Sequence, residues 1–207
     1  MPGTENQGPV KISRKDQIET IATALFKERG FSATSMRDLA SEIGIEAASI
    51  YAHVRSKEEI LQSVCFKMAH EFFKELEQIE KKADTHTEKL RQLIAVHVNI
   101  ITRNVAASAV FLNEWRHLSE PYASDFLQLR EQYEQRLRAI VRQGIATGEF
   151  VPSDARFVTR TLLSSLNGIT QWYKLDGELL PEAIAQNIGD LFLKGLMSHK
   201  DDRPKYH

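Results

Sequence analysis

The sequence is poor in cysteine and proline and has no long apolar run. Cys65 is the single cysteine in 207 residues, which excludes an intrachain disulfide and a cysteine-rich metal site. No apolar run approaches the roughly 18 residues of a membrane span, and the polar N-terminus shows no signal peptide. The formal net charge is −1, so the overall charge gives no argument for nucleic-acid binding. We therefore expect a cytoplasmic protein without membrane association.

Residues 36–53 predict two short helices joined by a tight turn. Ser35 suits the N-cap of the first helix, and Ala40 is small enough to let a second helix come close. Gly44 follows where the chain needs a left-handed residue, and Ile50 can fill the angle between the helices. Together these features indicate a helix-turn-helix, although a plain pair of core helices would share the same apolar pattern.

The flanking sequence favours the helix-turn-helix. Residues 30–35 read GFSATS, residues 40–45 read ASEIGI, and residues 50–60 read IYAHVRSKEEI, with a capping box at residues 56–59. These runs resemble the DNA-binding domain of the TetR family of bacterial repressors. The resemblance covers about the first third of the chain, and the rest matches in length and in its helical pattern. It implies a homodimeric repressor that a small apolar effector releases from a palindromic operator in double-stranded DNA.

The remaining sequence shows helical periodicity and no convincing strand, so we expect an all-α protein of about nine helices. Residues 14–56 would form the helix-turn-helix DNA-binding domain, and residues 57–200 a helical effector-binding and dimerisation domain. A long helix from Lys57 to about residue 82 would join them. Residues 1–13 would be a flexible arm and residues 201–207 a tail. The basic cluster of Lys11, Arg14 and Lys15, where the arm meets the DNA-binding domain, either lies along or in the minor groove, as the resemblance implies, or is simply solvated.

The resemblance also places candidate DNA contacts. Backbone contacts would come mainly from Thr34, Tyr51, His53 and Lys57, whereas Arg37 could reach a base edge or a phosphate. Base contacts would come from Ala47, Ala48 and Ser49 at the start of the recognition helix. Alanine cannot form bidentate hydrogen bonds but can touch thymine methyl groups, so we expect few direct base contacts. Glu46, where Ser or Thr is frequent, either faces DNA or caps the helix.

Polar residues on apolar helix faces mark a possible effector pocket. His97 and Glu114 either form an internal pair or line a pocket, since a buried carboxylate needs a partner. The pocket would be lined by His97, Phe111, Glu114, Trp115, Tyr133, Asn167, Gln171 and Trp172. Residues 114–118 (EWRHL) also resemble family members that sense acyl-CoA thioesters. Such an effector would need basic residues for its phosphates, with Arg103, Arg116 and Arg130 as candidates.

The last two long helices carry apolar residues around more than half of their circumference, which is more than one core face needs. Burial within the monomer would explain this, but the resemblance favours a four-helix dimer interface. The expected interface residues are Leu162, Ser165, Gly168, Ile188, Phe192 and Gly195.

The alternatives to an effector-responsive repressor are a constitutive DNA-binding protein and an enzyme. A constitutive DNA-binding or architectural protein with no effector would have a filled second domain. An enzyme is not indicated, since we find no Ser/His/Asp ordering and no phosphate loop. Glu114 and His117 have the spacing of half a di-metal carboxylate motif, but without a second copy we predict no metal and no cofactor.

Overall fold

The computed structural model describes residues 13–81 and 85–196, and all regular elements in these ranges are helices. This confirms the all-α prediction. The elements are α1 (Arg14–Arg29), α2 (Met36–Ile43), α3 (Ala47–Ile50), α4 (Lys57–Lys81), α5 (His86–Arg103), α6 (Val105–Asn113), the 3-10 helix η1 (Trp115–His117), α7 (Tyr122–Ala146), α8 (Ala155–Asn167), α9 (Ile169–Trp172) and α10 (Pro181–Leu196). Most of the predicted arm and all of the tail lie outside the described residues.

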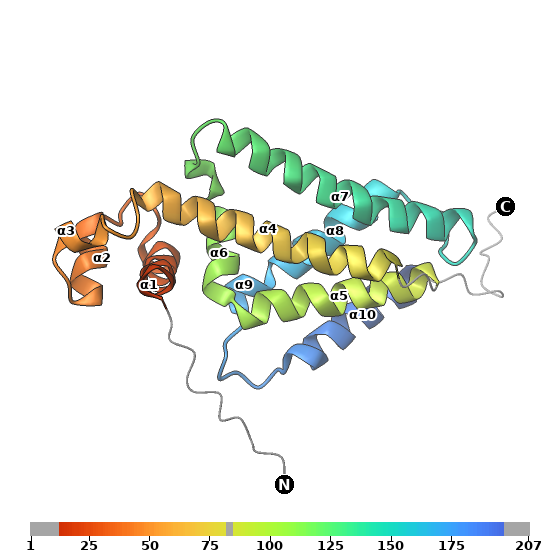
Figure 1. Cartoon of the computed structure of the whole chain (residues 1–207). Helices are drawn as coiled ribbons and strands as arrows, with labels where there is room; N and C mark the ends of the chain where they lie inside the picture. The colour runs from red at the N-terminus through yellow and green to blue at the C-terminus, as the bar shows by residue number, and fades with distance from the viewer. Residues whose placement is uncertain (1–12, 82–84, 197–207) are drawn as a thin grey trace, which may run out of the picture.

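Helix α4 connects the two parts of the molecule. It starts beside the small group formed by α1, α2 and α3 and runs along the larger group formed by α5 to α10 (Figure 1). Its buried face includes Ile60, Leu61 and Met68 near its start and Phe72 and Leu76 further on. Because this stripe is continuous, α4 contributes to the core of both groups.

The core does not stop at the predicted boundary between residues 56 and 57. One apolar cluster contains Ile18, Phe26 and Leu39 of the N-terminal group together with Val110 and Phe126 of the larger group. A second cluster joins α4, α5, α8 and α10, and α10 packs extensively against α5. A shift of α6 or α7 would therefore displace side chains that pack directly against the N-terminal group.

Three predicted helices differ from those observed. The apolar pattern of residues 106–118 predicts one helix, but α6 ends at Asn113 and the chain continues as η1. The sequence from residue 153 to about 175 predicts one helix, but it is divided into α8 and α9 at Gly168, a residue with low helix propensity. The second helix of the helix-turn-helix is regular only over Ala47–Ile50.

Among the described helices, no single one has both the length and the apolar composition of a membrane span. Helices α5 and α6 pass that test as a pair, but the chain bends by 103° between them. Their apolar residues, including Ile94, Val98 and Val110, lie in the core clusters.

Candidate DNA-binding and ligand-binding sites

The helix-turn-helix has the local geometry that its sequence predicts. Ser35 and Asp38 form a capping box, in which Asp38 N donates to Ser35 Oγ at 3.2 Å and Ser35 N donates to Asp38 Oδ2 at 2.7 Å. Gly44 has φ of +74°, a left-handed conformation that side chains other than glycine rarely adopt. Ala40 and Ile50 are 3% and 0% exposed, so both fill the contact between α2 and α3.

Most of the predicted DNA contacts form an exposed surface. Arg37, Ala48, Ser49, Tyr51 and His53 are exposed, and Ala47 is half-buried. Glu46 occupies the N-cap position of α3 but makes no side-chain cap hydrogen bond. The N-terminal end of α3 is thus open to a partner, as the docking of a recognition helix into a major groove requires.

Thr34 and Lys57 are placed differently. Thr34 is 1% exposed, and its hydroxyl donates to Gly30 O at 2.9 Å. Lys57 Nζ donates to Phe31 O at 2.8 Å and to Thr34 O at 2.9 Å, and it lies 4.3 Å from the centre of the Phe31 ring. In this conformation both groups have protein partners, so they hold the loop between α1 and α2 rather than present free donors to a phosphate.

Glu114 lies at the junction of the two parts of the molecule. Its Oε2 accepts a hydrogen bond from Phe31 N at 2.9 Å and lies 3.6 Å from His117 Nε2. The imidazole of His117 stacks on the Phe31 ring, with centroids 5.2 Å apart. Further along, Ser119 N donates to Glu58 Oε1 at 2.9 Å. Residues 114–119 therefore hold the α1–α2 loop and the start of α4.

A cavity of about 620 Å³ lies between α4, α5, α6, α7 and α8. This volume is within the usual range of small-molecule sites. Much of its wall is apolar, with Phe72 and Phe73 from α4, Phe111 from α6 and Leu163 from α8. The larger group is therefore not completely filled by its own side chains.

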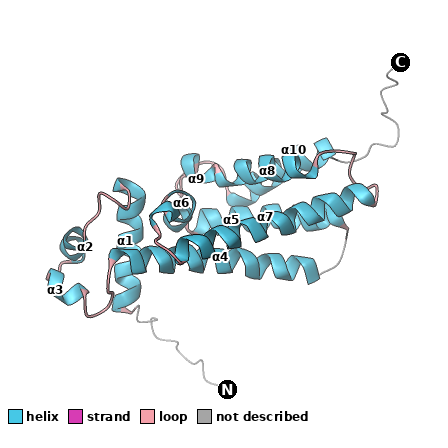
Figure 2. Cartoon of the chain, turned by 90° about the horizontal axis from the view of Figure 1, so that it is seen from above, coloured by secondary structure: helices cyan, strands magenta, loops and turns pink. Residues whose placement is uncertain are grey.

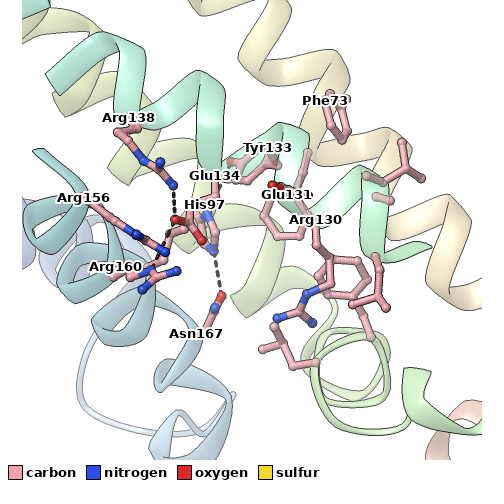
Figure 3. A pocket seen from close by; sticks show the side chains of 17 residues that line it. Phe73, His97, Arg130, Glu131, Tyr133, Glu134, Arg138, Arg156, Arg160 and Asn167 are labelled. Atoms are coloured by element: carbon pink, nitrogen blue, oxygen red, sulfur yellow. Dashed lines mark hydrogen bonds and ion pairs between the residues drawn. The ribbon is translucent and has the colours of Figure 1, made fainter. Parts of the chain in front are cut away.

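Three polar side chains meet in the aromatic wall of the cavity. His97 Nε2 lies 3.2 Å from Asn167 Oδ1, and Tyr133 Oη lies 3.5 Å from His97 Nδ1 (Figure 3). Burial lowers the pKa of His97 to about 4, against the opposing effect of the hydrogen bond to Asn167, so the imidazole is neutral at pH 7. Burial likewise raises the pKa of Tyr133, which keeps its hydroxyl protonated.

Arginines surround the remaining cavity wall. Figure 3 shows Arg138, Arg156 and Arg160 gathered about Glu134, with Arg130 on another side of the cavity. Glu134 pairs with Arg138 and, at 3.3 Å, with Arg160 Nε, whereas Arg156 has no ion pair in the part of the chain that the structure describes. Arg130 Nη1 and Arg138 Nε are buried and have no hydrogen-bond partner among the described residues.

The structure brings together only half of the predicted pocket residues. His97, Phe111, Tyr133 and Asn167 line the cavity. Glu114 does not, because its carboxylate faces the α1–α2 loop, and Trp115 packs beneath Arg130, 5.3 Å from the guanidinium carbon. Gln171 and Trp172 are exposed on α9, beyond the break at Gly168.

The predicted basic residues need a similar correction. Arg130 lines the cavity, but Arg103 pairs with Glu71 and Arg116 stacks on Trp115 at 4.9 Å. The prediction missed Arg138, Arg156 and Arg160. Arg156 and Arg160 are one turn apart and are the only charged residues of α8, and this spacing could have revealed them.

The predicted dimer-interface residues differ in their exposure. Leu162 is 1% exposed and belongs to the monomer core, so it has no free surface for a partner. Ile188 and Phe192 are half-buried against the same core. Gly168 is half-buried at the end of α8, and Ser165 and Gly195 are exposed. The largest exposed apolar side chains on these helices are Phe157 of α8 and Leu191 of α10, at 69% and 74%.

These features define a helical DNA-binding regulator with a helix-turn-helix next to a hollow helical domain. Residues 20–64 match the family model described as bacterial regulatory proteins, tetR family, and residues 83–196 match the one described as tetracyclin repressor-like, C-terminal domain. The second match alone covers more than half of the chain. The chain belongs to the TetR family, and is a DNA-binding transcriptional repressor rather than an enzyme.

Known proteins of this family are similar along nearly the whole chain. The HTH-type transcriptional repressor KstR2 of Mycolicibacterium smegmatis is 29% identical over 204 residues, which cover 98% of each chain. The structure of the ketosteroid transcriptional regulator KstR2 of Mycobacterium tuberculosis has a TM-score of 0.87 at 27% identity, covering 90% of this chain and 96% of that one. The structure of AibR in complex with isovaleryl coenzyme A and operator DNA has a TM-score of 0.76 at 23% identity, covering 86% and 97%.

Proposed function

We propose that the protein is a homodimeric repressor that an acyl-CoA thioester releases from a palindromic operator. The observation that carries this proposal is the cavity, which combines an apolar aromatic wall with an excess of arginine. Its lining contains four arginines, Arg130, Arg138, Arg156 and Arg160, against two glutamates, Glu131 and Glu134. An acyl chain suits the first feature, and the phosphates of coenzyme A suit the second.

Two buried donors support an anionic effector. Arg130 Nη1 and Arg138 Nε have no hydrogen-bond partner among the described residues, and unpaired buried donors cost free energy. Burial, with the charge of nearby Arg116, also lowers the pKa of Arg130. An anion bound beside these groups would accept hydrogen bonds from the unpaired donors and would stabilise the charge of the buried Arg130 guanidinium. The AibR complex supports the idea at the level of the fold, which there accommodates a coenzyme A thioester and operator DNA.

The dimer would form through α8 and α10, which lie on the side of the molecule away from α4 (Figure 2). Phe157, Thr161 and Ser165 are exposed at intervals of four residues on α8, and Leu191 and Gly195 are exposed on α10 with the same spacing. Exposed apolar side chains as large as Phe157 and Leu191 suit a contact with a second copy. The two α3 helices would then read half-sites about one duplex turn apart, roughly 34–36 Å.

The proposal is tested by fluorescence anisotropy on labelled DNA from the region upstream of the gene. We expect tight binding that weakens steeply with salt and collapses when one member of an acyl-CoA panel is added. Tight binding that no thioester affects would refute the effector class and favour the constitutive DNA-binding protein. Failure on this DNA and in a randomised-site selection would refute sequence-specific operator binding.

Two variants separate the two sites. Ala48→Asp places a negative charge on the exposed start of α3 and should raise the operator Kd at least tenfold, with effector binding unchanged. Arg156→Gln removes a guanidinium that lines the cavity and should weaken acyl-CoA binding about tenfold, with operator binding in the absence of effector unchanged.

A further inference from the structure

We infer that the cavity selects an effector whose apolar part carries a keto or hydroxyl oxygen, which accepts a hydrogen bond from Asn167 and, where it is a hydroxyl, also donates one to Tyr133. This inference rests on the proposed function and specifies the acyl group of the thioester. It starts from the hydrogen-bond inventory of the polar side chains in the aromatic wall, His97, Tyr133 and Asn167.

The donors and acceptors of this group follow from the geometry. His97 is neutral, and its Nε2 faces Asn167 Oδ1 at 3.2 Å, so the ring proton lies on Nε2. His97 Nδ1 then carries the lone pair and accepts from the Tyr133 hydroxyl at 3.5 Å. His97 therefore has a hydrogen-bond partner on each ring nitrogen. These two hydrogen bonds orient the side chains of Asn167 and Tyr133.

The remaining capacity belongs to Asn167 and Tyr133. In the part of the chain that the structure describes, no atom accepts a hydrogen bond from Asn167 Nδ2, although an amide has two protons to donate. Tyr133 Oη keeps lone pairs that no described donor uses. Both residues line the cavity, so it offers a ligand a pair of N–H donors beside a hydroxyl acceptor.

The surroundings of this group are apolar. The Phe72 ring centre lies 4.6 Å from that of His97, 5.6 Å from that of Phe111 and 5.7 Å from that of Tyr133. The part of a ligand that reaches Asn167 is therefore the part that contacts aromatic rings. A plain hydrocarbon there would cover the Asn167 amide and leave it unpaired, whereas an oxygen would pair with it.

Helix geometry places Asn167 away from the two arginines of its own helix, Arg156 and Arg160. Asn167 follows Arg160 by seven residues on α8, which corresponds to roughly 10 Å along the helix axis. A ligand with its anionic part near Arg156 and Arg160 would thus bring a different part of itself to Asn167. Ligand recognition in this cavity has two separate polar components, one for charge and one for a neutral oxygen.

The test measures Kd by isothermal titration calorimetry for matched thioesters. The probes are the even-chain acyl-CoAs from hexanoyl- to dodecanoyl-CoA, together with their (ω−1)-oxo and (ω−1)-hydroxy counterparts. For the best-fitting chain length, we expect an oxygenated thioester to bind at least tenfold more tightly than its hydrocarbon match. The keto and hydroxyl series then show whether the Asn167 donors alone suffice or the Tyr133 acceptor is also used.

Asn167→Leu and Tyr133→Phe keep the approximate size of each side chain but remove its polar group. Asn167→Leu should bring the preference for either oxygenated probe close to one, whereas Tyr133→Phe should reduce the preference for the hydroxyl probe alone. Leu163→Met alters the same wall without changing its polarity and should leave the preference intact. Circular dichroism and operator binding without effector confirm that each variant is folded.

The outcomes separate this inference from the proposed function. If the hydrocarbon thioesters bind and release the operator with no preference for oxygen, the inference is wrong and the acyl-CoA proposal stands. A preference that survives in both Asn167→Leu and Tyr133→Phe would also overturn it. If no thioester of any series binds, both the acyl-CoA proposal and the inference are refuted.

Discussion

Replacing Glu114 by alanine should loosen the DNA-binding domain without disturbing the cavity. Glu114 Oε2 accepts from Phe31 N at 2.9 Å, and the Glu114 side chain is only 19% exposed. Phe31 itself is 8% exposed, so its amide would lose its acceptor in a place that water reaches poorly. A hydrogen bond to a charged group contributes about 1.5–3 kcal/mol, and we expect this loss in the free energy of unfolding for Glu114→Ala.

Glu114→Gln gives an intermediate case, because its amide oxygen can still accept from Phe31 N. A neutral hydrogen bond contributes about 1 kcal/mol, so roughly half of the stabilisation should remain. Glu28→Ala serves as the matched control, since this glutamate lies at the end of α1 with a 69% exposed side chain and pairs only with Arg29 among the described residues.

Two measurements test this reasoning. Denaturant unfolding gives the change in stability, and amide hydrogen exchange reports Phe31 directly. Glu114→Ala should speed exchange at Phe31 and weaken operator binding, because the α1–α2 loop loses the acceptor that holds it. If Phe31 exchanges as in the wild type and stability falls by less than about 0.5 kcal/mol, the contact contributes nothing of consequence.

Three further predictions concern the fold, the dimer and pH. Gly44→Ala should lower stability by about 1–2 kcal/mol in thermal unfolding, because φ is +74° there although a Cβ would meet no atom within 4 Å; an unchanged melting temperature would contradict this. Phe157→Asp should convert dimers to monomers in analytical ultracentrifugation and weaken operator binding; a variant that stays dimeric would exclude α8 from the interface. Glu149 is partly desolvated, which raises its pKa, but hydrogen bonds from Thr87 and His86 outweigh this and lower the pKa from 4.5 to about 2. Because the pKa of Glu149 is lower in the folded state, its stabilisation is present above pH 4.5 and is lost as the pH falls toward 2. Water screens this carboxylate, so the wild type should lose only about 1 kcal/mol of unfolding free energy over that window relative to Glu149→Gln. Denaturant unfolding at each pH measures this loss.

The features that the sequence predicted well depend on neighbours in the chain. Ala40, Gly44 and Ile50 act within ten residues of one another, so their spacing already specifies how α2 meets α3. The capping box of Ser35 and Asp38 is equally local. Such contacts are encoded by propensity and periodicity, which a single sequence displays.

The features that it missed depend on contacts between distant segments. Phe31 and Glu114 are 83 residues apart, and no periodicity indicates that the helix ending at Asn113 would present a carboxylate to the α1–α2 loop. Arg138 and Arg160 meet at Glu134 only because α7 packs on α8. Apolar patterns could place these residues on helices, but the partner of each face is decided by tertiary packing.

Helix α6 connects the cavity to the DNA-binding domain over a very short distance. Phe111 lines the cavity and packs on Phe126, whose ring centre is 5.3 Å away, and Phe126 belongs to the cluster that includes Phe26 and Phe31. Three residues after Phe111, Glu114 binds the α1–α2 loop. An effector can change operator affinity only by the difference between its affinities for the two conformations. A ligand that moves Phe111 would shift both the shared core and the Glu114 contact. These two contacts therefore explain how the effector's affinity can differ between the two conformations of the DNA-binding domain.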